Sequence, residues 1–137
     1  MNRLIQFKGK KTDSTNYVVG FFFGRSASDE CVSFIGFTPY SIHNVWTDSM
    51  GEFCGFELPN KIRLFEGDII AYDNRDNHMK SDFNAVIEFH NGCFGLQYIT
   101  GDYEGIFSPF SDFHEPEKYL LPYLTIIGTD FDDRFRH

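Results

Sequence analysis

The sequence predicts an all-β fold of mainly antiparallel strands, with at most one or two short helices. Its 137 residues include 17 Phe, 7 Tyr and 1 Trp, and bulky aromatic side chains favour the pleated, half-buried surface of a sheet. Ala and Leu, two strong helix formers, are scarce. Short apolar runs alternate with turn formers along the chain. This length corresponds to about one domain, which can bury a core without disulfide staples.

The first half of the chain contains five short segments with the composition of strands. They cover residues 4–7, 17–23, 31–35, 41–46 and 53–56. The second and third flank a short polar loop, which indicates an antiparallel hairpin. Gly20, inside the second segment, indicates a bulge or a close approach of another backbone.

The run Glu66-Gly67-Asp68 predicts a tight turn that starts a strand over residues 69–72. Gly67 tolerates a positive φ. Asp68 is placed to accept a backbone N–H across the turn. The polar residues of this run therefore have a structural explanation before any catalytic one.

The pair Asn91-Gly92 is the strongest short-range hairpin signal in the sequence. It separates the apolar runs 83–89 and 93–99, and a type I′ turn needs positive φ at both central positions. Apolar residues alternate from Phe83 to Phe89, as expected for a strand with one mainly apolar face.

The C-terminal region predicts a mixture of irregular and regular structure. Residues 100–112 are expected to be irregular. Residues 115–121 predict one or two helical turns, with Pro116 near their start. Residues 123–127 predict a last strand that ends at Gly128. The tail, 129–137, either packs through Phe131 and Phe135 or frays.

The chain carries a formal charge of -8 and a pI near 4.9. A nucleic-acid binder normally presents a basic surface, because neutralising phosphates supplies most of its affinity. Arg3, Lys8, Lys10 and Lys11 form a local exception, for which a solvated strand edge is the simpler interpretation. Nucleic acid is therefore disfavoured as a partner.

The cysteines and the apolar runs predict a cytoplasmic protein with no membrane partner. Cys31, Cys54 and Cys93 are odd in number and widely spaced, unlike a disulfide scaffold. No signal peptide is visible at the N-terminus, and the longest apolar stretch, 17–24, is too short to span a bilayer.

Four segments of the chain carry short motifs in a recognisable order. These are Ile5-Gln6-Phe7-Lys8-Gly9-Lys10 with Tyr17-Val18-Val19-Gly20, then Gly55-Phe56 with Leu64-Phe65-Glu66-Gly67-Asp68-Ile69-Ile70, then Val86-Ile87-Glu88-Phe89-His90-Asn91-Gly92-Cys93-Phe94, and finally Thr125-Ile126-Ile127-Gly128-Thr129-Asp130-Phe131. Together they resemble the YopX family of phage and prophage proteins. The chain departs from the family at Tyr17, where Trp is usual, at Thr129, where Asn is usual, and at Leu58-Pro59-Asn60-Lys61, which lacks the family's Asp-x-x-Gly turn.

The resemblance implies a fold rather than an activity. It implies one YopX-like domain over residues 1–137 with two subdomains. Residues 1–60 would form a small N-terminal β unit packed on an SH3-like barrel in residues 61–137, whose strands would lie within 64–128. The family has no established activity, so no residue inherits a catalytic role.

Metal-ligating and nucleophilic residues are present but poorly grouped. The candidate ligands are Cys31, Cys54, Cys93, His43, His78, His90 and His114. Structural zinc sites favour closely spaced Cys and His, and the only near pair is His90 and Cys93. We expect His90 on the hairpin surface and Cys93 in the core. A nucleophilic Cys93 paired with His90 or His114 is not favoured. General acid–base catalysis by Glu66 and Asp68 is not favoured either. The sequence thus predicts no catalytic residue, cofactor or metal.

Three functions remain open. The first is a non-enzymatic binding or assembly module of phage or prophage origin, self-associating as a homo-oligomer or binding a host or phage protein, because aromatic content exceeds what one core needs. The second is a nucleic-acid-associated protein, or an acidic mimic that binds a host DNA-binding protein. The third is a small enzyme. Most phenylalanines are expected in the core.

Overall fold

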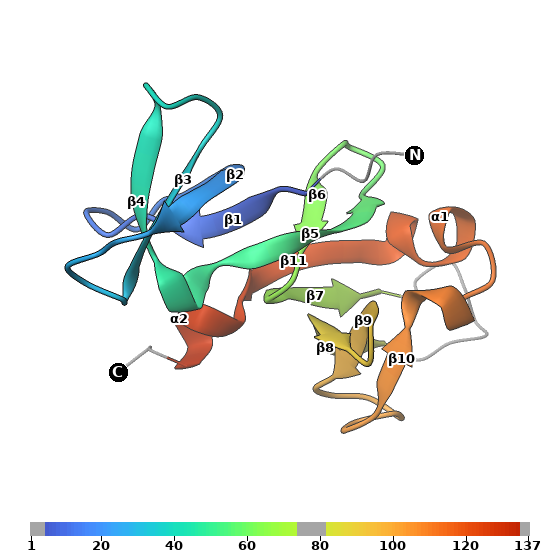
Figure 1. Ribbon diagram of the computed structural model, residues 1–137. Coiled ribbons are helices and arrows are strands. Elements are labelled where there is room, and N and C mark those ends of the chain that lie inside the picture. The colour runs from blue at the N-terminus through green and yellow to red at the C-terminus, as the bar shows by residue number, and fades with distance from the viewer. Residues whose placement is uncertain (1–4, 74–81, 135–137) are drawn as a thin grey trace. The chain divides into compact units, whose positions relative to one another are not determined.

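The computed structural model describes residues 5–73 and 82–134 (Figure 1). The chain divides into two compact units, Met1–Gly55 and Phe56–His137. The predicted subdomains 1–60 and 61–137 place their boundary after residue 60, whereas the units divide after Gly55. Strands dominate both units, and all of the strand pairs described are antiparallel. The predicted all-β, mainly antiparallel class is confirmed.

The first unit is built on four consecutive strands and the start of a fifth. They are β1 (Phe7–Lys10), β2 (Tyr17–Arg25), β3 (Val32–Gly36), β4 (Ile42–Trp46) and β5 (Gly51–Glu57), with a 3-10 helix, η1 (Thr47–Ser49), before β5. Their order in the sheet is β4-β3-β2-β1-β5. Lys11, just after β1, forms a bridge with Val45 of β4, so the sheet curls until its first and fourth strands meet. The predicted hairpin of the second and third segments is β2–β3.

The first strand was predicted at 4–7 but lies at Phe7–Lys10. Gly9 lies outside the predicted segment, yet it is an interior strand residue. A Cβ at this position would lie 3.0 Å from Ile35 Cδ1 and 3.0 Å from Val45, so the glycine permits the close packing of β1 on the core. Gly20 serves the same purpose, because a Cβ there would lie 2.8 Å from the backbone of Gly36.

The second unit contains a five-stranded sheet. After the last two residues of β5 come β6 (Arg63–Phe65), β7 (Asp68–Tyr72), β8 (Phe83–His90), β9 (Cys93–Tyr98), β10 (Phe107–Pro109) and β11 (Leu124–Thr129). The sheet order is β10-β9-β8-β7-β11, while β6 follows β5 in the other sheet. Strands β7 to β10 thus form a meander, and β11 returns beside β7. This order is compatible with an SH3-like barrel, which stays a prediction.

The C-terminal region contains the predicted helical turns but differs from the sequence prediction in residues 100–112, at the end of the last strand and in the tail. Residues 100–112 contain β10 and a 3-10 helix, η2 (Phe110–Asp112). The predicted helical turns are present as α1 (Pro116–Tyr119) and the 3-10 helix η3 (Leu121–Tyr123). Strand β11 continues past Gly128 through a register shift, and α2 (Asp130–Arg134) follows it directly. The tail therefore starts as a helix, and Phe135 lies outside the described residues.

The core residues are more aliphatic than the composition suggested. Among the described residues, the buried phenylalanines are Phe53, Phe65 and Phe110. The expectation that most phenylalanines are core is therefore wrong. Strand β8 also departs from simple alternation, because Ala85, Val86 and Ile87 are all buried. A central strand covered on both faces buries consecutive residues, so its apolar pattern does not reveal a single inner face.

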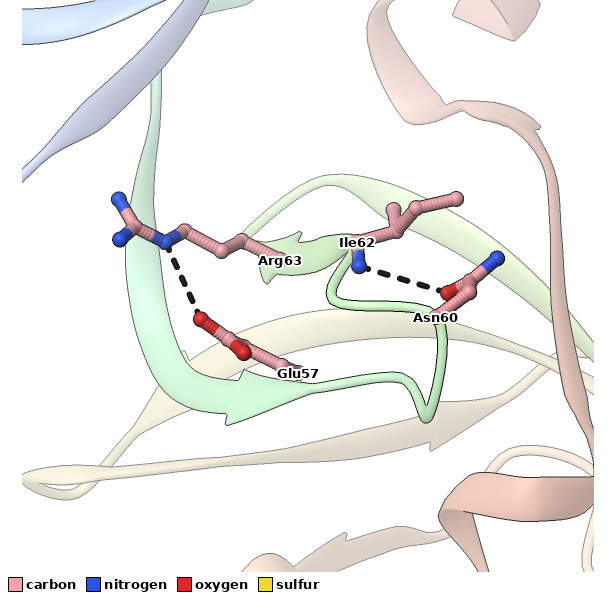
Figure 2. A network of polar contacts seen from close by, with 4 residues as sticks. All are labelled: Glu57, Asn60, Ile62 and Arg63. Atoms are coloured by element: carbon pink, nitrogen blue, oxygen red, sulfur yellow. Dashed lines mark hydrogen bonds and ion pairs between the residues drawn. The ribbon is translucent and has the colours of Figure 1, made fainter.

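The turn between β5 and β6 takes a defined shape although it lacks the Asp-x-x-Gly pattern. Figure 2 shows its polar contacts: Arg63 Nε lies 3.3 Å from Glu57 Oε1, and the Ile62 N–H donates to Asn60 Oδ1 at 3.4 Å. The backbone N–H of Lys61 donates to the Leu58 carbonyl at 2.8 Å. Lys61 has a φ of 67°, the left-handed conformation that glycine adopts without strain.

Replacing Lys61 with glycine is expected to raise the free energy of unfolding by about 0.5–1 kcal/mol, because relief of left-handed strain outweighs the added entropy of the unfolded chain. The side chain is exposed, so little packing is lost. Urea denaturation of the wild type and the variant measures the difference. Lys61→Ala is the matched control, since it keeps the strain and should change stability little. Equal effects of glycine and alanine would contradict the prediction.

Candidate functional site

The Glu66-Gly67-Asp68 run serves the backbone, as the sequence predicted. Asp68 is fully buried, and its Oδ2 accepts the Phe65 N–H at 2.9 Å. Gly67 has a φ of 92°. Its N–H donates to the Ile87 carbonyl at 2.8 Å, and its carbonyl accepts the Asp130 N–H at 2.7 Å. The turn thereby ties β7 to β8 and to the start of α2.

The Asn91-Gly92 hairpin is also confirmed. Both residues have positive φ, 52° and 81°, and His90 pairs with Cys93 across the turn. His90 lies on the surface, where its Nε2 is 2.6 Å from Glu88 Oε2. The expectation that Cys93 is in the core is wrong, because the thiol is exposed. This end of the hairpin extends beyond the buried part of β8 and β9, so its last residue pairs face solvent.

The other candidate metal ligands do not converge. Within residues 5–73 and 82–134, no group of three or more His, Cys, Asp or Glu side chains is arranged to hold a metal ion. Cys31 is exposed and Cys54 is buried. His114 lies beside Glu115, with 3.2 Å between Nε2 and Oε2. His78 lies outside the described residues.

The hydroxyl of Tyr98, at the end of β9, has a shifted pKa. Burial raises the pKa of this phenol, the hydrogen bond with Ser108 partly lowers it, and nearby Tyr103 raises it further. A tyrosine with a raised pKa stays neutral throughout the physiological range. Tyr98 is a buried phenol that hydrogen-bonds to Ser108.

A small surface hollow of about 330 Å³ lies in the first unit, between the β1–β2 turn and β4. Its lining residues are Lys11, Thr12, Asp13, Ile42, His43 and Asn44. Lys11 Nζ lies 3.8 Å from Asp13 Oδ1, and the aspartate side chain is 77% exposed. Solvent screens such a pair, so the hollow gives no buried acid–base pair from these two residues.

The group of basic residues near the N-terminus, for which the sequence favoured a solvated strand edge, is only partly described, because Arg3 lies outside the described residues. Lys8 Nζ lies 5.5 Å from the centroid of the Tyr17 ring. Lys10 is directly opposite Tyr17 in the β1–β2 ladder. Lys11 is turned toward Asp13 instead. Lys8 and Lys10 therefore share one side of the sheet with Tyr17.

The most distinctive surface of the first unit is a group of apolar side chains on the outer side of β2, β3 and β4. Ladder partners share a side of the sheet, and Phe21 pairs with Gly36, which pairs with Ile42. The opposite side holds the buried Ile35 and Val45. We call the outer group the aromatic face. Its members are Tyr17, Phe21, Phe34, Phe37, Ile42 and Trp46.

The aromatic face is both exposed and ordered. Phe21 is 40% exposed, Phe37 58% and Trp46 37%. The rings of Phe21 and Phe37 meet edge to face, with centroids 5.9 Å apart. At the tip of the β3–β4 hairpin, the Ser41 N–H donates to the Thr38 carbonyl at 3.1 Å, and this turn presents Tyr40 almost completely to solvent. Contiguous exposed apolar surface of this kind marks interaction sites.

Sequence reasoning did not locate this surface. Apolar residues run almost without interruption from Tyr17 to Phe23, so no alternation in the sequence separates the two sides of this strand. The strand pairing assigns the sides, because ladder partners lie on the same side of the sheet.

Comparison with known proteins supports the fold. No family model and no curated protein matches the chain. The crystal structure of protein EF1440 from Enterococcus faecalis is similar, with a TM-score of 0.54 and 13% sequence identity over 98% of this chain and 99% of that chain. At this identity the likeness shows a shared fold alone. Among the described residues, no helix combines the length and apolar composition needed to cross a bilayer.

Proposed function

We propose that this chain is a non-enzymatic binding or assembly module that works in the bacterial cytoplasm as a phage or prophage accessory protein. The observation that carries the proposal is the aromatic face. Protein interfaces are enriched in aromatic residues and depleted of charge at their centres. Strands β1 to β4 contain no acidic residue, and their outer side combines aromatic rings with Lys8 and Lys10.

The resemblance of the four motif segments to the YopX family supports the phage or prophage origin. The turn chemistry supports a non-enzymatic role, because the conspicuous polar residues Asp68 and Asn91 are engaged in chain reversal. The binding surface would then be the sheet face rather than either turn.

An affinity pull-down tests the proposal. The immobilised chain is incubated with lysate of a lysogenic host, in nuclease-treated and untreated arms. The double variant Phe21→Thr with Trp46→Thr should reduce the captured protein at least about tenfold, since truncating an interface hot spot costs about 2 kcal/mol or more.

Ile127→Thr is the matched control for that experiment. Ile127 is an exposed apolar strand residue of the second unit, and its replacement should leave capture unchanged. Equal capture by wild type and double variant, in both nuclease arms, would contradict the proposal.

A second candidate function is an acidic mimic that binds a host DNA-binding protein. The specific observation is the charge distribution between the units. Residues 1–55 contain five basic and five acidic residues, whereas residues 56–137 contain 7 basic and 15 acidic residues. The second unit therefore carries all of the net charge of -8. A mimic would capture a basic protein and show no DNA affinity, whereas a direct DNA binder would show affinity that falls with salt.

A further inference from the structure

We propose that the chain assembles head to tail, with the aromatic face of one copy receiving the β9–β10 loop, residues 99–106, of a second copy. This inference rests on the proposed function and names the partner of the same surface. Three properties of the two surfaces support it: their apolar content, their order and their charge.

The β9–β10 loop presents apolar and acidic side chains together. All residues from 99 to 106 are exposed, and the large apolar ones are Ile99, Tyr103 and Ile106, at 40%, 60% and 51%. Asp102 and Glu104 lie on either side of Tyr103 in the sequence. The loop therefore offers an apolar centre with carboxylates beside it.

Backbone hydrogen bonds hold this loop in one shape. The Tyr98 N–H donates to the Ile106 carbonyl at 3.0 Å, the Gly105 N–H to the Tyr98 carbonyl at 2.9 Å, and the Ile106 N–H to the Tyr103 carbonyl at 2.9 Å. Gly101 and Gly105 have φ of 103° and 86°, which permits the tight reversals. An ordered loop loses less conformational entropy on binding than a flexible one.

The charges of the two surfaces are complementary. The aromatic face has Lys8 and Lys10 at its β1 side, and strands β1 to β4 contain no carboxylate. The loop contains Asp102 and Glu104 and no basic residue. Opposite charges at the edge of an interface orient the partners and suppress wrong pairings.

Complementarity between two different surfaces favours contact between the aromatic face and the loop. An aromatic face that met a second aromatic face would bring lysines and no carboxylate into the contact. A loop that met a second loop would bring carboxylates and no lysine. Contact between face and loop brings opposite charges together, whether the contacts continue from copy to copy or close reciprocally in a dimer.

A charge-exchange experiment with the full chain tests the proposal. The first variant carries Lys8→Glu and Lys10→Glu, and the second carries Asp102→Lys and Glu104→Lys. Sedimentation velocity at low ionic strength, over a concentration series, gives the molar mass. Wild type should exceed its monomer mass of 15.9 kDa as concentration rises. Each variant alone should remain a monomer.

An equimolar mixture of the two variants should restore association, because the acidic face of the first matches the basic loop of the second. The unchanged basic face of the second variant also matches the unchanged acidic loop of the first, so both contacts form and the molar mass should rise with concentration as it does in the wild type. Restoration also shows that both variants are folded. Wild type that stays monomeric at every concentration, or a mixture that stays monomeric, overturns the proposal.

Two further outcomes overturn the proposal by assigning the aromatic face to another partner. The first is association of the wild type that persists in the second variant. The second is a monomeric wild type that binds a labelled single-stranded oligonucleotide and loses that binding in the first variant. Capture of a host protein by a monomeric wild type, lost with Phe21→Thr and Trp46→Thr, would leave the proposed function standing while the head-to-tail assembly fails.

Discussion

Replacing Asp68 with alanine is expected to lower the free energy of unfolding by roughly 3 kcal/mol, because hydrogen bonds to a charged group and the cost of an unpaired buried N–H are each of order 1–3 kcal/mol. The carboxylate is fully buried, and its Oδ2 accepts the Phe65 N–H at 2.9 Å. Without it, that amide loses this acceptor in the interior. Urea denaturation of the full chain measures the loss.

Two further variants separate this effect from general damage. Asp68→Asn keeps the size of the side chain and one carbonyl acceptor, so it should lose less stability than alanine. Asp13→Ala removes an aspartate that is 77% exposed, and a surface change of this kind should stay within about 0.5 kcal/mol of wild type. If alanine at 68 were no worse than alanine at 13, the carboxylate would not hold the turn.

The turn at Asp68 was predicted correctly, and it shows which parts of the fold can be predicted from the sequence. A tight turn depends on two or three adjacent residues whose conformational preferences are intrinsic. The same reasoning placed the Asn91-Gly92 reversal and the two strands beside it. Each of these predictions uses local chemistry, and none requires knowledge of a distant segment.

Predictions failed where a distant segment decides the outcome. Gly9 is a strand residue because Ile35 and Val45 approach it closely, and nothing near Gly9 in the sequence reveals those neighbours. Cys93 is exposed because its hairpin end extends past the covered part of the sheet. The short helix α2 is likewise tied to the Gly67 carbonyl through the Asp130 N–H.

The aromatic face belongs to the second category. Its members come from three strands and the β3–β4 loop, and strand pairing sets which side the strand residues occupy. Sequence composition predicted a surplus of aromatic side chains beyond one core, and few phenylalanines are buried among the described residues. Where these surplus aromatic side chains lie depends on which strands pair, and strand pairing joins residues that are far apart in the sequence.

Gly95→Ala is expected to lower the free energy of unfolding by about 3 kcal/mol, the upper part of the usual range for overpacking. Gly95 lies in β9, between Glu88 of β8 and Pro109 of β10. A Cβ there would lie 2.4 Å from the Ser108 carbonyl oxygen and 2.7 Å from Pro109 Cα. Both are backbone atoms, so rotamer changes do not relieve the clash and β10 must move away from β9.

Gly128→Ala in β11 is the matched control, because it adds the same methyl group to a strand of the same unit. No neighbouring atom lies within 4 Å of a Cβ at Gly128, so stability should hold or rise by about 0.5 kcal/mol, since glycine is entropically costly in a strand. Chemical denaturation compares the two variants, and amide hydrogen exchange should show lost protection at β10 in Gly95→Ala alone. Because β10 anchors one end of the 99–106 loop, the same variant should weaken head-to-tail association. Similar stabilities for the two alanine variants would mean that β9 and β10 are not in close contact.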